Sequence, residues 1–346
     1  MKRLSLLGLS AGLLLGLAAT VQTAHAESTL EIVKDRGHLR CQVGPPSPGF
    51  YQLSEDGVWS GSDVSVCRGI AAAIFGDPNK VEFQSVTSAV RFTALANGES
   101  DLLSRTTTWT LFRETQLGLD FTAINFYDGQ GFMVPVDSGI NSAFELAGAT
   151  VCVLTGTTTE LNLADFSRAN GLDIQSVVFE DFKVRDDTYR NGGCDAVTND
   201  KSGLASSLAA FPDPGAHTIL GETISKEPLG PMVRQGDSQW RDIVMWTVFA
   251  MINAEEWGID SSNVDEMRAN PPSPEVARML GVEGDLETGL GLEKDWAYNI
   301  IKHVGNFGQV YEAYMGSGPE GINIPRKGSP NALWTQGGLM YSPPFR

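Results

Sequence analysis

An alternation of strand-like and helix-like segments constrains the fold of this chain more than any other feature. Leu39, Cys41 and Val43 alternate with polar residues, which predicts a strand with one buried face. Apolar residues from Val64 to Phe75 follow helical spacing, and Gly76-Asp77-Pro78 would end that helix. The pattern continues with a strand at 81–86, a helix at 89–96 and a buried strand at 101–104. Such alternation predicts a parallel sheet with helices on both faces.

The same pattern starts again after Gly131. A strand at 150–154 leads to Thr157-Thr158-Thr159-Glu160, which has the sequence of a capping box and would open a helix that ends at Asn170-Gly171. Two α/β units are therefore expected, and the roughly 320 residues of the mature chain suggest two domains by size as well. The further elements expected are a strand at 177–179, a helix at 187–191, a strand at 194–198, and two amphipathic helices at 239–255 and 296–311.

The first 26 residues have the composition of a signal peptide. Lys2 and Arg3 precede an apolar run from Leu4 to Val21, and Ala24-His25-Ala26 supplies a small-x-small cleavage pattern. A membrane anchor is the alternative, but the run is of marginal length and the cleavage pattern follows it directly. We expect cleavage after Ala26 and an exported, soluble mature protein.

The chain is strongly acidic, with 25 Lys and Arg against 42 Asp and Glu and a formal net charge of −17. Cleavage would remove Lys2 and Arg3 and leave 23 basic residues, for a net charge of −19. Such a chain repels nucleic acid and anionic lipid, so neither is an expected partner.

Four cysteines in an exported chain favour two disulfides, for which three pairings exist. We favour Cys41 with Cys67 and Cys152 with Cys194, because each pair then stays inside one α/β unit. Four buried free thiols are the alternative, which an oxidising compartment disfavours.

The candidate binding residues begin with a threonine run that precedes an arginine. Thr106, Thr107 and Thr108 each offer a hydroxyl donor and acceptor, and Arg113 offers a planar fork that fits a carboxylate. A strand edge followed by a solvated arginine would explain the same stretch. Together these residues predict a socket for a small anion.

Two further segments would end at the same edge of the sheets. Gly156, Thr157 and Thr158 form a strand-to-helix turn whose amides lie at the positive end of a helix dipole, although a capping box alone would explain it. Asp200 ends a strand, where it could equally be a plain N-cap. Ligands of open α/β sheets bind at the carboxyl ends of strands. A carboxylate held by Arg113 and the amides, with an ammonium held by Asp200, specifies an α-amino acid.

With these residues in place, the chain resembles the periplasmic solute-binding proteins of polar amino-acid ABC importers (solute-binding family 3). It is most similar to their general L-amino-acid-binding branch, over essentially the whole mature chain. The stretches that carry the resemblance are Gly61-x-Asp63-Val64, Arg91–Leu95, Thr106–Arg113, Phe121-Thr122, Tyr127–Val134, Val151–Leu161, Cys194–Asp200 and Ile224–Gly230.

The resemblance implies a two-lobed periplasmic-binding-protein fold of type II, in which each lobe is a mainly parallel sheet flanked by helices. Two hinge strands would join the lobes, near Phe132–Val136 and Pro231–Gln235. Lobe 1 would comprise residues 27–133 and 232–346, with an extension from about 283, and lobe 2 residues 134–231.

The resemblance also implies roles for the candidate residues. Arg113 would bind the α-carboxylate with Thr106 and Thr108, the turn at Gly156, Thr157 and Thr158 would add amides from the other lobe, and Asp200 would take the ammonium. Phe50 is the candidate aromatic over the ligand side chain, with Tyr51 behind it. Arg91 is either a surface ion pair or a determinant for acidic, polar or γ-glutamyl-like ligands.

The function implied is that of a periplasmic amino-acid-binding component of an ABC transporter. It would be a monomer without cofactor or metal that presents a free L-amino acid to an inner-membrane permease. A secreted enzyme similar to cyclohexadienyl dehydratases is the alternative, but His38, His217 and His303 fall outside the three cleft segments. A module that feeds a sensor would need the same cleft.

Overall fold

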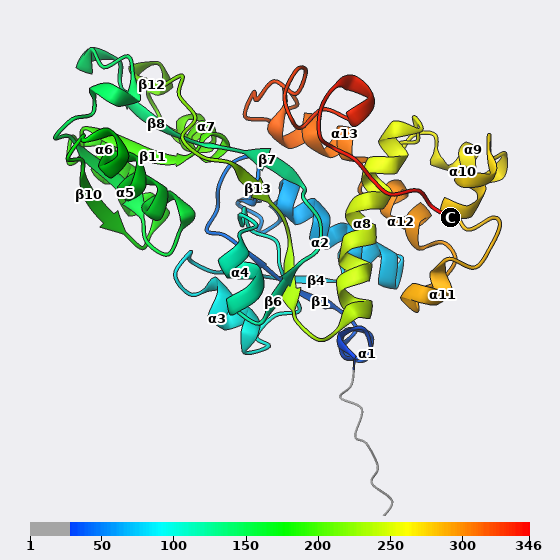
Figure 1. Ribbon diagram of the computed structural model, residues 1–346. Helices are drawn as coiled ribbons and strands as arrows, with labels where there is room; N and C mark the ends of the chain where they lie inside the picture. The colour runs from blue at the N-terminus through cyan, green and yellow to red at the C-terminus, as the bar shows by residue number, and fades with distance from the viewer. Residues whose placement is uncertain (1–27) are drawn as a thin grey trace, which may run out of the picture.

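The computed structural model describes residues 28–346. The predicted signal peptide, residues 1–26, lies outside them. None of the helices in this range has the length and apolar character needed to cross a membrane. Two sheet-containing lobes lie beside each other, and the C-terminal helices pack against the first lobe (Figure 1).

The first lobe contains a five-stranded sheet in the order β4-β1-β5-β14-β6. Strand β1 pairs in parallel with β4 and β5, whereas β14 is antiparallel to its neighbours β5 and β6. These strands are β1 (Leu39–Val43), β4 (Val81–Ser85), β5 (Leu102–Leu103), β6 (Leu119–Phe121) and β14 (Met232–Arg234).

The second lobe repeats this arrangement in the order β10-β9-β11-β8-β12. Strand β9 is parallel to β10 and β11, and β8 runs antiparallel to β11 and β12. The strands are β8 (Gln130–Pro135), β9 (Thr150–Leu154), β10 (Gln175–Phe179), β11 (Ala196–Asp200) and β12 (His217–Ile219). The antiparallel strand within each sheet adjoins a crossing between the lobes, so the predicted two-lobed α/β fold is confirmed.

The lobes are joined by two short antiparallel strands, β7 (Phe126–Asp128) and β13 (Glu227–Leu229), in which Asp128 lies opposite Glu227. The predicted hinge positions, Phe132–Val136 and Pro231–Gln235, are therefore wrong, because β8 belongs to the second sheet and β14 to the first. A continuously buried apolar strand looks the same in sequence whether it crosses between lobes or lies inside a sheet.

Helices flank both sheets. In the first lobe these are α1 (Thr29–Arg36), α2 (Ser62–Phe75), α3 (Arg91–Ala96), α4 (Leu111–Gln116) and α8 (Ser238–Glu256), followed by α9 (Val264–Ala269), α10 (Pro274–Met279), α11 (Glu287–Leu290), α12 (Trp296–His303) and α13 (Phe307–Val310). In the second lobe they are α5 (Thr158–Asn170), α6 (Phe182–Arg190) and α7 (Lys201–Ala210). A short antiparallel hairpin, β2 (Gln52–Leu53) and β3 (Trp59–Ser60), precedes α2.

One predicted helix, 296–311, is two helices in the structure. Gly305 has a φ of 97°, which a helix does not allow, and it separates α12 from α13. Asn306 then opens α13 with a capping box completed by Gln309.

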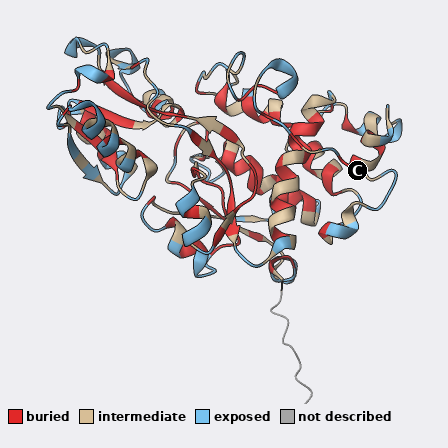
Figure 2. Cartoon of the chain, viewed as in Figure 1, coloured by how far each residue is buried: buried red, intermediate tan, exposed pale blue. Residues whose placement is uncertain are grey.

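The C-terminal region shares the apolar core of the first lobe. Trp240, Ile300 and Tyr311 belong to one buried cluster with residues of β1 and α2, and buried residues follow the sheets and the inner helices (Figure 2). Farther along the chain, the Asn331 side chain bonds both backbone groups of hinge residue Tyr127: Oδ1 accepts from N at 2.7 Å and Nδ2 donates to O at 2.9 Å.

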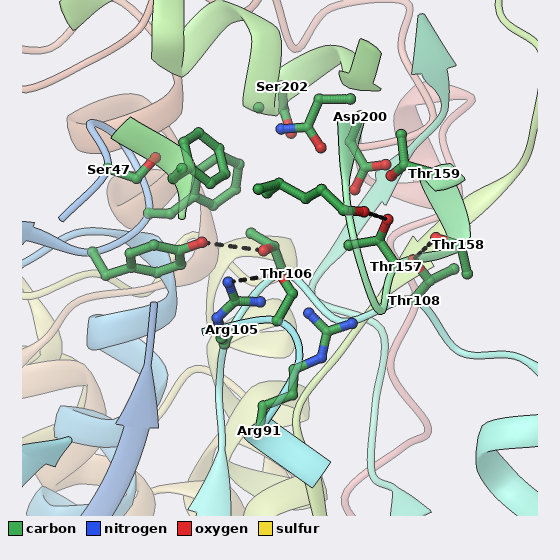
Figure 3. Close-up of a pocket in the computed structure, with 17 residues that line it drawn as sticks. Ser47, Arg91, Arg105, Thr106, Thr108, Thr157, Thr158, Thr159, Asp200 and Ser202 are labelled. Atoms are coloured by element: carbon green, nitrogen blue, oxygen red, sulfur yellow. Dashed lines mark hydrogen bonds between the residues drawn. The ribbon is translucent and has the colours of Figure 1, made fainter. Parts of the chain in front are cut away.

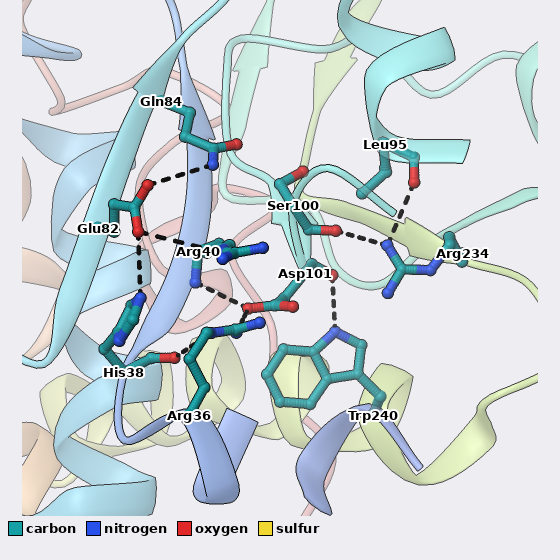
Figure 4. Close-up of polar contacts among 10 residues, drawn as sticks. All are labelled: Arg36, His38, Arg40, Glu82, Gln84, Leu95, Ser100, Asp101, Arg234 and Trp240. Atoms are coloured by element: carbon teal, nitrogen blue, oxygen red, sulfur yellow. Dashed lines mark hydrogen bonds and ion pairs between the residues drawn. The ribbon is translucent and has the colours of Figure 1, made fainter. Parts of the chain in front are cut away.

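A polar cluster joins elements at the amino ends of the first lobe's strands (Figure 4). The Asp101 carboxylate pairs with Arg36 and accepts from the Arg40 amide at 2.7 Å. The Trp240 indole N–H donates to the Asp101 carbonyl at 2.9 Å, which attaches α8 to the sheet.

Two disulfides are present, Cys41–Cys67 between β1 and α2 and Cys152–Cys194 between β9 and the segment before β11. These are the two pairings favoured from the sequence, and each lies within one lobe.

Candidate functional site

A cavity lined by residues of both lobes lies between them at the carboxyl ends of β5, β9 and β11 (Figure 3). The lobes touch beside it: the hydroxyls of Thr108 and Thr158 are 3.3 Å apart. Those of Ser47 and Ser206 are 2.6 Å apart. The structure therefore represents a closed arrangement. The wall contains Ser47, Phe50, Tyr51, Ser88, Arg91, Arg105, Thr106, Thr108, Leu154, Thr157, Thr158, Thr159, Phe182, Asn199, Asp200, Ser202 and Gly203.

The threonine run forms a strained turn in this wall. Thr106 has a φ of 34°, a region that β-branched residues rarely adopt. Its amide donates to Asp63 Oδ2 at 2.9 Å, and Asp63 Oδ1 accepts from the Asn125 side chain at 3.0 Å. Burial raises the pKa of Asp63, while these hydrogen bonds oppose the rise. Asp63, which lies in the first turn of helix α2, thus holds the backbone at Thr106 in place.

Arg113 lies behind this turn. It follows the N-cap Thr110 in α4, and its Nη1 donates to the carbonyl of Thr108 at 2.9 Å. Burial lowers the pKa of Arg113 to about 10, although Glu227 and Asp200 act in the opposite direction. Arg113 is not one of the wall residues, but its hydrogen bond to the Thr108 carbonyl places its guanidinium next to one of them.

Two other arginines reach the cavity directly. Arg91 and Arg105 are each only 3% exposed. Arg105 donates from Nε to the Val86 carbonyl at 3.0 Å and from Nη2 to the Ser88 hydroxyl at 3.1 Å. Burial lowers the pKa of both arginines, and the charges of Arg105 and Arg113 lower that of Arg91 further.

Arg91 differs from the surface ion pair considered from its sequence context. Its guanidinium lies over the Phe92 ring at 4.6 Å, and its Nε is buried without a hydrogen-bond partner among the described residues. Sequence reasoning overlooked Arg105, which directly precedes the threonine run. The positive φ of Thr106 interrupts the strand geometry there, and no sequence pattern predicts this backbone conformation.

The turn at Gly156 only partly matches its expected role. Thr157 caps α5 by accepting from the Glu160 amide at 3.1 Å, whereas the Glu160 carboxylate accepts from the Gly156 amide at 3.1 Å. The Gly156 amide is therefore occupied, and Gly156 is not in the wall. Thr157 and Thr158 are in the wall, and Thr158 Oγ1 donates to Glu227 Oε2 at 3.0 Å.

Asp200 ends β11 but does not act as the side-chain cap of α7. That role falls to Asp128, which accepts from the Ser202 amide at 3.2 Å. Asp200 Oδ1 is buried without a hydrogen-bond partner among the described residues, and its carboxyl group points toward the cavity (Figure 3). Burial and the charges of Asp128 and Glu227 raise the pKa of Asp200 well above its usual range. A carboxylate in this setting favours a cation.

Aromatic side chains close another part of the wall. Phe50 and Tyr51 are both buried, and Phe50 packs edge-on against Phe126 with ring centroids 6.2 Å apart. The Tyr51 hydroxyl lies 3.2 Å from Thr106 Oγ1. The other wall residues that sequence reasoning did not select are mostly small or hydroxyl-bearing and carry no pattern: Ser47, Ser88, Leu154, Thr159, Phe182, Asn199, Ser202 and Gly203.

The arrangement suits a ligand with charges of both signs. Among the 17 described wall residues, Asp200 is the one acid, and the cations Arg91 and Arg105 come from the opposite lobe. A zwitterion bridging the lobes would be attracted to both, which stabilises the closed state.

Comparisons with known proteins agree with this geometry. Two relatives match over nearly the full chain. The glutamate/glutamine/aspartate/asparagine-binding protein of Rhodobacter capsulatus is 50% identical over 95% of this chain and 97% of its own. The general L-amino acid-binding periplasmic protein of Rhizobium johnstonii is 48% identical over 98% of each chain. A periplasmic binding protein of an ABC transporter from Brucella ovis, solved with glutathione bound, superposes with a TM-score of 0.90 at 50% identity, over 93% of this chain and 100% of that one. The model of the bacterial extracellular solute-binding proteins, family 3, matches residues 39–259. The chain belongs to this family.

Proposed function

We propose that this protein is the periplasmic substrate-binding component of an ABC importer and that it binds a free L-amino acid between its lobes. One observation carries the proposal: an unpartnered buried carboxylate, Asp200, faces buried arginines of the other lobe across a closed cavity. The amino-acid ligands named for the two curated relatives agree with this reading.

The head group occupies the site in the following way. Asp200 accepts from the α-ammonium, which provides the missing partner of its buried oxygen. Arg113, Thr106 and Thr108 serve the α-carboxylate from the first lobe, and the helix-opening segment Thr157–Thr158 serves it from the second. Phe50 covers the ligand side chain. Because Arg113 also donates to the Thr108 carbonyl, it holds Thr108 in position at the same time.

Binding rather than catalysis is the proposed task. The three described histidines lie outside the cavity wall: His38 lies beside Glu82, His217 beside Tyr189, and His303 ends α12. We also propose that the protein is exported by its signal peptide and is a monomer. Its partner is then an inner-membrane permease, to which it delivers the ligand for transport, and not a sensor.

Calorimetry on protein unfolded in guanidinium and refolded, which removes retained ligand, tests the proposal. We expect L-amino acids to bind and D-enantiomers to bind far more weakly. Arg113→Ala should abolish binding, whereas the charge-matched control Arg40→Ala, on a partly exposed β1 arginine, should not. Absence of amino-acid binding would refute the function, and near-native affinity in Arg113→Ala would refute the site assignment.

A further inference from the structure

A π-helical turn in the C-terminal region lies beneath one part of the cavity wall. This turn, Tyr311–Met315, follows α13 and falls outside residues 39–259, the part of the chain that matches the family. Turns of this kind are rare and are frequent at functional sites. The contacts of the turn lead to Phe50, the wall residue assigned to cover the ligand side chain.

A row of three buried rings connects the wall to this turn. The ring of Phe50 packs edge-on against Phe126 of the hinge strand β7, with centroids 6.2 Å apart. Phe126 in turn stacks on Tyr311, with centroids 6.1 Å apart and ring planes within 6° of parallel. Both distances lie in the range in which aromatic pairs attract each other. Tyr311 therefore supports Phe50 through one intervening ring.

The backbone beside Phe50 rests on the same C-terminal segment. Gly49 has a φ of 81°, and a Cβ there would lie 3.0 Å from both the Tyr314 carbonyl oxygen and Ile322 Cδ1. A Cβ at Gly61, the N-cap of α2, would lie 2.2 Å from the Phe50 carbonyl oxygen. Neither glycine leaves room for a side chain, so the loop that carries Phe50 is held between the C-terminal segment and the start of α2.

Tyr311 is itself held by a charged group. The Arg326 guanidinium lies 5.2 Å from the Tyr311 ring centroid, an attractive cation–π arrangement. The same guanidinium pairs with Glu255 of α8, with Nη2 and Oε2 2.8 Å apart, and its Nε donates to the Asn331 carbonyl at 2.8 Å. The ring of Tyr311 is thus fixed against Phe126 from its other neighbours.

We propose that Tyr311 is a positioning residue that holds Phe50 over the ligand side chain, so that side-chain selectivity depends on a C-terminal segment outside the family-matched region. This rests on the proposed amino-acid-binding function and deepens it. Tyr311 is not a wall residue, so it acts through Phe126 and Phe50. A small, mostly apolar cavity already adjoins Phe126 and Tyr311. Loss of the Tyr311 ring would therefore let Phe126 move away from Phe50.

Calorimetry of the refolded protein with two probes tests the proposal. One probe is whichever of L-glutamine, L-glutamate, L-arginine and L-leucine the wild type binds most tightly, and the other is glycine, which shares the head group and lacks the side chain. Tyr311→Leu should weaken binding of the first probe about fivefold, the effect of one lost aromatic contact, and change glycine binding less than about twofold. Competition against the first probe gives the Kd of glycine if direct titration does not.

Two controls separate the ring from other effects of substitution. Tyr311→Phe keeps the ring and should leave both affinities within about twofold of wild type. Tyr298→Leu makes the same change at a C-terminal tyrosine that instead bonds Asp265 and lies against Arg268, and it should also leave both affinities unchanged. Circular dichroism checks that each variant is folded, and Phe126→Leu, which removes the intermediate ring, replaces Tyr311→Leu if that variant is unfolded.

A double substitution asks whether Tyr311 acts through Phe50. In the Phe50→Leu background, Tyr311→Leu should change binding of the first probe less than about twofold, because the cover is already lost. A further fivefold loss there would overturn the proposal. For the replacement variant, Phe126→Leu in the Phe50→Leu background has the same expected and contrary results.

The remaining outcomes separate this inference from the function on which it rests. Equal loss of both probes in Tyr311→Leu would overturn it, because a general effect on closure or stability acts on the shared head group. Wild-type affinities for the two probes within about twofold of each other would also overturn it, since no cover would then be reading a side chain. Absence of binding for every probe would refute the proposed function itself.

Discussion

Asp200→Asn gives the sharpest test of the site, because it keeps the side-chain shape and removes only the charge. Asp200 Oδ1 has no hydrogen-bond partner among the described residues, so the proposed ammonium contact is its main favourable interaction. Truncating one partner of a buried charge pair costs about 2–5 kcal/mol. We take about 2.7 kcal/mol, which corresponds to an increase in Kd of about 100-fold.

The same change should not destabilise the unliganded protein. The pKa of Asp200 is raised by burial and by Asp128 and Glu227, so its ionised form disfavours folding at every pH above the unfolded pKa. Asparagine removes that penalty, and the Tm without ligand should stay constant or rise.

Thermal unfolding with and without ligand measures both effects. With ligand at about 100 times the wild-type Kd, the wild type gains about 2.7 kcal/mol and Asp200→Asn only about 0.4 kcal/mol. At about 2 °C per kcal/mol for a chain of this size, the ligand-induced rise in Tm falls from about 5 °C to less than about 1 °C. Asp173→Asn is the matched control, an exposed second-lobe aspartate with a φ of 51°, a conformation that asparagine tolerates. A Kd within about threefold of wild type in Asp200→Asn would show that the ammonium contact is absent.

Three further predictions concern the hinge, the closure contact and the disulfides. Burial raises the pKa of Asp128 to about 6, so the folded state binds more protons than the unfolded state from about pH 4 to 6. The free energy of unfolding therefore falls as the pH rises through this window. Urea titrations of wild type and Asp128→Asn should give a difference in this free energy that changes over the window and is constant above about pH 7. Thr158→Val removes the hydroxyl shared with Thr108 and Glu227, and we expect Kd to rise about fivefold and small-angle scattering to show a larger radius of gyration with ligand absent; an unchanged radius would contradict a closing role. Replacing Cys152 and Cys194 by serine opens a loop with a sequence separation of 42 and should lower the free energy of unfolding by about 4 kcal/mol, whereas a loss below about 1 kcal/mol in urea titrations would contradict a stabilising role.

Much of the fold follows from local sequence patterns. Helix α2 ends at Phe75 as predicted, because Gly76, with a φ of 66°, stops it there, and its first residue, Ser62, lies two residues before the predicted start. The order of strands in each sheet was not predicted, since pairing between strands far apart in sequence leaves no local signal. The hinge was misplaced because β8 is as apolar as a crossing strand would be, and only its pairing with β11 shows where it belongs.

The site was predicted less completely than the fold. Thr106, Thr108, Thr157, Thr158 and Asp200 do meet at one cavity, as their positions at strand ends suggested. The Gly156 amide is taken by Glu160, a competition that depends on one rotamer of one side chain. The prominence of Arg105 depends on the backbone turn at Thr106, which tertiary contacts from Asp63 enforce and which the threonine sequence itself disfavours.

The contact between Asn331 and Tyr127 has a consequence for how this protein can be modified. By bonding both the amide and the carbonyl of one hinge residue, the Asn331 side chain imitates the backbone of a neighbouring strand and covers the open edge of β7. The C-terminal segment that contains Asn331 is thereby attached to the hinge strands that join the two lobes. Trimming the chain before Asn331 would uncover that edge and soften the pivot, so truncated versions are unsuitable for measuring affinity. A fluorophore attached close to Asn331 would instead sense opening and closing from outside the cavity, where it cannot obstruct the ligand.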